Sequence, residues 1–179
     1  MGIEILGMIV LSQLLQPGAP VIADPFPFTT DMATGNSLNS SVEVTLATAA
    51  AVEYIKRAYR VPVHTYGFGT DSPVTDGQAA TETTLKGLMA SLAGADLLSG
   101  AGMVESINGF SLIQLLVDNN LIGILRRVNK GVKVDDDTLA WKEILKTDPG
   151  GHFLEFTHTL EHCREALRPK LFIHKEWEI

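Results

Sequence analysis

Carboxylates and aromatic residues gather in this sequence where an apolar segment ends in a glycine-rich loop. The clearest case is residues 61–82, which begin as a short apolar strand ending at Tyr66 and continue into a loop that carries Phe68 and Asp71. The segment then opens a helix, for which Asp76 is the expected N-cap. In proteins built of strand–loop–helix units, ligands bind at such junctions. We therefore expect a binding site here, although turn closure and capping would also explain both aspartates.

Helices and strands alternate along the chain. Apolar runs and helical periodicity predict strands at 19–23, 61–66 and 95–99 and helices at 5–16, 40–58, 76–93 and 111–129. A short strand at 152–156 and helices at 138–147 and 159–167 are expected after them. The capping box Ser40-x-x-Glu43 is expected to open the helix at 40, Gly94 to end the helix 76–93, and the acidic run 135–137 to cap the helix that follows it. Alternation of this kind predicts an α/β protein with parallel strands and right-handed crossovers. Since a closed (β/α)8 barrel takes about 250 residues, the 179 residues predict one domain, either a small open sheet or part of a barrel.

The apolar segment 5–15 needs its own interpretation. It is shorter than the roughly 20 residues that span a bilayer, and an acidic residue, Glu4, stands where a signal peptide carries basic ones. We expect a buried helix that begins abruptly, as in a truncated chain, and no membrane association.

Net charge and cysteine content limit the partners and the cellular compartment that we expect for this protein. The formal net charge is −7, so no basic stripe exists to neutralise nucleic-acid phosphates. The single cysteine, Cys163, excludes an internal disulfide and indicates a reducing compartment. We therefore expect a cytoplasmic protein without a nucleic-acid partner.

Two short motifs suggest ligands only weakly. The Gly100-x-Gly102 pair resembles a dinucleotide loop, but Glu105 stands where the third glycine would be, and its charge would repel a pyrophosphate. His158 and His162 are four residues apart, which places two imidazoles on one helical face. Because no acidic third ligand of recognised spacing accompanies them, we expect solvent-facing or capping histidines and no metal site.

Taken together, the motifs resemble the trimethylamine methyltransferase family, the corrinoid-protein methyltransferases that include glycine betaine enzymes. They occur in the family's order over nearly the whole chain. The matching pieces are Pro17-Gly18-Ala19-Pro20-Val21-Ile22, Asp31-Met32-x-Thr34-Gly35, Thr70-Asp71-Ser72, Asp76-x-Gln78-Ala79-x-x-Glu82, Leu92-Ala93-Gly94-Ala95, Gly100-Ala101-Gly102-Met103-x-Glu105, Pro149-Gly150-Gly151-His152-Phe153-Leu154 and His158-Thr159.

The resemblance implies that residues 1–179 are the C-terminal part of a TIM (β/α)8 barrel. It also implies transfer of a methyl group from trimethylamine, glycine betaine or a similar amine to the cobalt of a corrinoid, as in methanogenesis. The corrinoid would be carried by a separate partner protein, so no cofactor is expected to bind this chain directly. Some members use pyrrolysine; none stands here, which favours the quaternary-amine branch.

A quaternary ammonium has no proton to donate, so aromatic faces and carboxylates must hold it. Residues of these two kinds lie at the predicted strand ends, although the phenylalanines would equally fill a barrel mouth. The residues expected to bind substrate are Asp31, Tyr66, Phe68, Asp71 and Glu105, with Gln78 and Glu82 in support. Since cobalt is the nucleophile, the protein orients the reactants, and no catalytic residue is assigned.

A second hypothesis is a non-catalytic half-barrel. A partial barrel leaves open sheet edges and an apolar face, which favour self-association or a protein partner. A homo-oligomer is expected in that case, and little turnover is expected from this chain alone. A barrel enzyme for phosphorylated substrates is weaker, because no basic residue lies near a predicted strand end.

Overall fold

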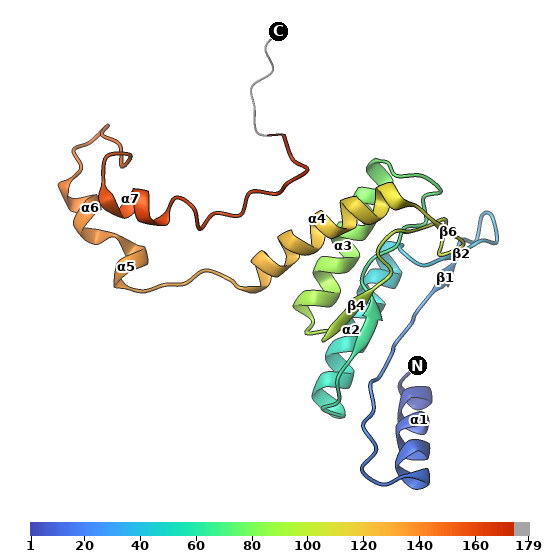
Figure 1. The fold of residues 1–179 in the computed structure, drawn as a ribbon. Coiled ribbons are helices and arrows are strands. Elements are labelled where there is room, and N and C mark those ends of the chain that lie inside the picture. Colours follow the sequence, from blue (N-terminus) through green and yellow to red (C-terminus); the bar gives the residue numbers. More distant parts are fainter. Residues whose placement is uncertain (174–179) are drawn as a thin grey trace. The chain divides into compact units, whose positions relative to one another are not determined.

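The computed structural model describes residues 1–173 and divides the chain into two compact units, Met1–Leu125 and Arg126–Ile179 (Figure 1). Each unit is described by itself. The expectation of a single domain stays a prediction.

The first unit contains parallel strand–helix–strand connections. Strand β3 (His64–Tyr66) pairs in parallel with β4 (Leu97–Ser99), and helix α3 (Gly77–Leu92) connects them. One residue before β3, Val63 bridges in parallel to Ala23, and helix α2 (Val42–Ala58) connects these two segments. Helices α2 and α3 pack against each other (Figure 1). The α/β class predicted from the sequence fits this arrangement, but the predicted strand 19–23 is reduced to the single bridge.

Two antiparallel hairpins, which the sequence did not predict, lie beside the parallel pair. The long loop from residue 24 to 39 contains β1 (Thr29–Thr30) and β2 (Ser37–Leu38), joined by a turn in which Asp31 accepts hydrogen bonds from Ala33 N and Thr34 Oγ1. After β4, strands β5 (Met103–Val104) and β6 (Gly109–Phe110) form the second hairpin. A two-residue strand is too short to show a period-2 pattern, so only the turn residues could have signalled either hairpin.

Glycine lets the chain turn tightly after β4. Gly100 has φ +91°, and a Cβ atom built there would lie 2.4 Å from the carbonyl oxygen of Phe68. Only glycine fits this position, because any side chain would meet both an unfavourable dihedral and backbone atoms. The turn brings β5 next to the loop that follows β3.

Helix capping follows the sequence at two sites and shifts at a third. Asp76 caps α3 by accepting a hydrogen bond from Ala79 N at 2.8 Å, and Asp135 caps the short helix α5 together with Thr138. Helix α2, however, is capped by Ser41 and not by Ser40. Ser40 is buried and donates its hydroxyl hydrogen to the carbonyl of Gly69 at 2.9 Å, so it fastens the loop after β3.

The core lies between the parallel strands and their helices. One buried cluster contains Ala23, Val52, Ile55 and Val63, and a second contains Phe68, Leu121 and Leu125, the last two on helix α4 (Leu112–Asn129).

Apolar spacing predicts buried faces that include Leu46, Tyr54 and Ile55 in α2 and Ala79, Leu85 and Leu92 in α3, and this prediction is only partly right: Ile55 and Ala79 are buried. In α2 and α3 the exposed side chains include Leu46, Tyr54, Leu85 and Leu92, whereas the buried ones include Thr45, Thr48, Thr83 and Lys86. Two of these threonine hydroxyls donate hydrogen bonds to backbone carbonyls one turn earlier, Thr48 to Val44 and Thr83 to Ala79. These hydrogen bonds offset the free-energy cost of burying the hydroxyls. Apolar periodicity alone therefore indicated the buried face only in part.

Helix α1 (Gly2–Leu15) forms as predicted, but none of its residues is buried. The helix is apolar around its whole circumference, and only Ile5 packs against the first core cluster. The expectation of a buried helix was therefore wrong for this structure. Among residues 1–173, no helix is both long and apolar enough to cross a membrane.

The second unit is made of short helices. They are α5 (Asp136–Leu139), α6 (Trp141–Lys146) and α7 (Thr157–His162), and they follow the last turn of α4. The predicted helix 138–147 is interrupted at Ala140, which has φ +48°, and the predicted strand 152–156 does not form. No residue between 126 and 173 is buried, so the described part of this unit has no hydrophobic core.

Candidate functional site

A cavity of about 520 Å³ lies in the first unit, beside the loop that follows β3. Its walls come from the β1–β2 hairpin, from this loop, and from the turn between β5 and β6. The lining residues are Phe26, Phe28, Asn36, Ser37, Leu38, Asn39, Asp71, Glu105, Ser106, Ile107 and Asn108. Asp71 and Glu105, which the sequence analysis named, therefore line one space together with the phenyl rings of Phe26 and Phe28.

Asp71 joins all three walls of the cavity. Its Oδ1 accepts hydrogen bonds from Asn39 N at 2.8 Å and from Ser106 Oγ at 2.7 Å, and its Oδ2 accepts from Ser40 N at 2.9 Å. Hydrogen bonds to an ionised carboxylate are stronger than neutral ones. Asp71 is therefore both a negative charge at the cavity and the residue that fixes the cavity's shape.

Glu82, on helix α3, supports the loop from behind. Its Oε2 accepts hydrogen bonds from Thr70 Oγ1 at 2.5 Å and from Asp71 N at 2.8 Å, and its Oε1 accepts from Gln78 Nε2 at 2.8 Å. Gln78 and Glu82, which the sequence analysis expected to support the substrate site, do not line the cavity. Glu82 holds the backbone of Asp71, and Gln78 holds Glu82.

Three consecutive residues of the β5–β6 turn, Glu105, Ser106 and Ile107, have positive φ values of 53°, 49° and 72°. Non-glycine residues rarely adopt this conformation, which costs of the order of 1 kcal/mol each. Hydrogen bonds to the loop after β3 hold the turn: Glu105 N donates to Ser72 O at 2.8 Å and Ser106 N to Thr70 O at 3.0 Å. The turn thereby places the Glu105 carboxylate at the cavity.

A buried carboxylate anchors the same hairpin. Asp118 of α4 accepts hydrogen bonds from Gly102 N and from Gln114 Nε2, both at 2.8 Å. Burial raises the pKa of Asp118, and these hydrogen bonds oppose the rise.

An aromatic cluster borders the cavity. The rings of Phe26 and Tyr66 have centroids 4.7 Å apart, and those of Phe26 and Phe28 are 6.5 Å apart. His64 stacks edge-on to Tyr66 and is held by Asp24 Oδ2 at 3.1 Å from its Nδ1. Tyr66 therefore lies behind the Phe26 wall of the cavity.

Two predicted site residues lie elsewhere. Phe68 is buried in the core against Leu121 and Leu125 and not at the cavity. Asp31 lies in the β1–β2 turn, where the hydrogen bond from Thr34 lowers the pKa of its carboxyl. Both residues perform structural roles here, because their side chains already have partners in the core and in the turn.

Lys86 is a charged residue of the site that the sequence analysis missed. It is 3% exposed, and its Nζ donates a hydrogen bond to the carbonyl of Asn39 at 2.6 Å. Burial lowers the pKa of Lys86 from 10.5 to about 8, while the charges of Asp71 and Glu82 oppose this. A signal did exist: Lys86 lies seven residues after Ala79, and this spacing puts both on one face of α3.

Asn39 and Ser106 were also missed. Asn39 contacts Asp71 through its backbone N–H and Ser106 through its hydroxyl, and neither group produces a recognisable sequence pattern. Their partner Asp71 is more than 30 residues away in each case.

The site and fold together define an α/β protein with a cavity lined by carboxylates and phenyl rings beside the loop that follows a parallel strand. The family model described as "Trimethylamine methyltransferase (MTTB)" matches residues 2–178. The chain belongs to this family, as the motifs indicated.

Characterised relatives agree with this assignment. The chain is 36% identical over 168 residues to trimethylamine methyltransferase MttB of Desulfitobacterium hafniense and to that of Methanosarcina barkeri, covering 94% of this chain and 34% of each relative. It is 34% identical over 170 residues to a glycine betaine methyltransferase of Desulfitobacterium hafniense, of which it covers 35%. The chain thus spans about a third of the length of these relatives.

Proposed function

We propose that this chain is part of a methyltransferase that binds a tertiary or quaternary methylated amine in the cavity beside Asp71. The observation that carries the proposal is that two carboxylates, Asp71 and Glu105, and two phenyl rings, Phe26 and Phe28, line one cavity. Cation–π attraction and carboxylate charge are the two forces that hold an ammonium lacking N–H groups. The names of the similar proteins, which include both a trimethylamine and a glycine betaine enzyme, support this substrate class.

The chain's own residues would bind and orient the amine. Asp71 supplies a negative charge whose position is fixed by three hydrogen bonds, and Glu105 adds a second charge at the cavity wall. Phe26 and Phe28 exclude water and face the methyl groups. The corrinoid of a separate partner protein would supply the cobalt that accepts the methyl group. Because the cobalt would itself be the nucleophile, a serine or cysteine nucleophile is not required.

The proposal extends to the whole enzyme. The parallel connections around β3 and β4 would be units of the C-terminal part of a (β/α)8 barrel, in which substrate sites lie at the carboxyl ends of the strands. The remaining strands and part of the pocket would come from the other two thirds of the enzyme, and the cytoplasm would be its compartment. A non-catalytic half-barrel is not favoured, because the similar proteins are named as methyltransferases.

The test is the affinity of the 179-residue chain for matched ligands, measured by isothermal titration calorimetry. Choline carries a trimethylammonium group, and 3,3-dimethyl-1-butanol is its neutral isostere. We expect choline to bind about 10-fold more tightly, corresponding to about 1.4 kcal/mol of cation recognition. Glycine betaine and trimethylamine are titrated alongside to rank the methyl donors.

Two variants locate the binding. Glu105→Gln removes a charge at the cavity and should erase most of the preference for choline. Glu43→Gln removes an exposed charge in the first turn of α2, outside the cavity, and should leave the preference unchanged. Equal affinities for the two ligands in the unaltered chain would refute the proposal.

A further inference from the structure

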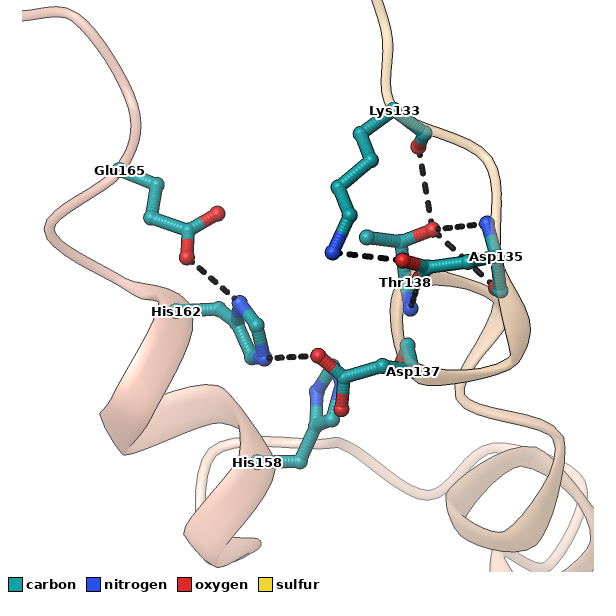
Figure 2. Close-up of polar contacts among 7 residues, drawn as sticks. All are labelled: Lys133, Asp135, Asp137, Thr138, His158, His162 and Glu165. Carbon is teal, nitrogen blue, oxygen red and sulfur yellow. Dashed lines mark hydrogen bonds and ion pairs between the residues drawn. The ribbon is translucent and has the colours of Figure 1, made fainter.

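A cluster of two imidazoles and a carboxylate lies in the second unit, independent of the proposed amine site. Asp137 of α5 faces His158 and His162, which lie one turn apart on α7 (Figure 2). One potential ligand atom from each residue lies within 4.8 Å of the other two. The sequence analysis noted the histidine spacing but not the acidic third member, because Asp137 is 21 residues before His158.

We infer that Asp137, His158 and His162 bind a divalent transition metal, with Zn²⁺ as the expected ion. The distance between His162 Nε2 and Asp137 Oδ2 is 3.4 Å. Two ligands of a tetrahedral Zn²⁺ ion, each about 2.0–2.1 Å from the metal, are about 3.4 Å apart. His158 Nε2 lies 4.0 Å from Asp137 Oδ1, so a small movement of one ring completes the set.

The orientation of His162 supports this inference. Its Nδ1 lies 2.8 Å from Glu165 Oε1 (Figure 2), and a carboxylate can only accept a hydrogen bond, so Nδ1 carries the proton. In the neutral ring, the lone pair of Nε2 then faces the Asp137 carboxylate. Either a proton on Nε2 or a metal cation between the two atoms would make this 3.4 Å approach favourable. A carboxylate on the far nitrogen is also the usual outer contact of a metal-bound histidine.

The surrounding charges leave the cluster open to a cation. The nearby ammonium of Lys133 pairs with Asp135 and not with Asp137 (Figure 2). The thiol of Cys163, next to His162 in sequence, donates to the Leu160 carbonyl. Two imidazoles and one carboxylate remain as ligands, a donor set typical of zinc with a fourth position left for water.

One contact must change when the metal binds. His158 Nε2 lies 2.8 Å from the backbone carbonyl of Asp137, and since a carbonyl only accepts, this nitrogen carries the proton in the metal-free chain. Binding would move that proton to Nδ1 and exchange the carbonyl for the metal. Without metal, the same contact ties α7 to α5 as a simple hydrogen bond.

The metal would compensate for a missing core. No residue from 126 to 173 is buried, and a unit of this size without a core commonly needs a metal or another cross-link to stay folded. Asp137 and His158 are 21 residues apart, so a shared metal would close a long loop between α5 and α7. A bound metal would therefore stabilise this unit, and its fourth position would stay open to water.

The test uses the untagged 179-residue chain after treatment with a chelator. It is titrated with Zn²⁺ by calorimetry and with Co²⁺ by visible absorption, in which tetrahedral coordination gives an intense band. We expect one equivalent of metal and a tetrahedral cobalt spectrum. A chain that binds no metal, or whose cobalt spectrum stays that of the hydrated ion, overturns the inference without any variant.

Variants then assign the ligands. Asp137→Asn and His162→Ala should each weaken zinc binding by at least 10-fold, and Glu165→Gln should weaken it 10- to 100-fold, as is usual for outer contacts. The matched control is His152→Ala, which removes an exposed imidazole of the same unit outside the cluster and should leave affinity unchanged. Undiminished binding in a chain lacking Asp137, His158 and His162 together would place the metal elsewhere and refute the assignment.

Discussion

Lys86 should make the stability of this protein depend on pH in the alkaline range. Burial lowers the pKa of this lysine from 10.5 to about 8 in the folded chain. Between these two values the unfolded chain holds a proton that the folded chain has released. The free energy of unfolding therefore increases as pH rises through this window, and the contribution is complete above the unfolded pKa.

The size of the effect follows from the shift. One pKa unit corresponds to about 1.4 kcal/mol, so the full shift is worth about 3 kcal/mol. Most of it, about 2 to 3 kcal/mol, should be gained between about pH 7 and pH 10. The assay is urea denaturation followed by far-ultraviolet circular dichroism at several pH values in this range.

Lys86→Met isolates the contribution, because it removes the titrating group and keeps a side chain of similar length. Its unfolding free energy should lack the alkaline gain. Lys142→Met, which removes an exposed helical lysine, should retain it. Parallel pH profiles for the unaltered chain and Lys86→Met would refute the reasoning.

Two further pairs of substitutions test the cavity and the fold by thermal unfolding. Asp71→Asn leaves one of three donors without an acceptor and should lower the free energy of unfolding by about 2 kcal/mol. Ser106→Ala deletes one donor and should lower it by about 1 kcal/mol. Equal effects of the two substitutions would contradict the assigned role of Asp71. Gly100→Ala should cost about 2 kcal/mol or more, because its Cβ would meet the Phe68 carbonyl. Gly123→Ala, with open space inside α4, should instead stabilise by about 0.5–1 kcal/mol.

The local features predicted from sequence were those with local causes. Asp76 and Asp135 cap helices with donors only three residues away, and Gly94 ends α3 with φ +94°. Such contacts form wherever the segment folds, so the sequence alone indicates them.

The buried faces of the helices could not be predicted in the same way. Leu46 and Leu85 are exposed while Thr45 and Lys86 are buried, because burial depends on which neighbour a helix packs against. A hydroxyl or an ammonium that finds a backbone carbonyl can occupy the core side. Apolar periodicity shows which side chains prefer burial, but it does not show whether a buried polar side chain will find a hydrogen-bond acceptor.

The sequence by itself determined the family and the alternation of helices and strands, and it singled out Asp71 and Glu105, which line one cavity in the structure. Only the tertiary structure decided that Asn39, Ser106 and Lys86 join Asp71 from distant segments, that Phe68 belongs to the core, and that Asp137 meets two histidines. The reason is physical: these groupings depend on loop closure and on contacts between residues far apart in the chain, which leave no fixed spacing to read.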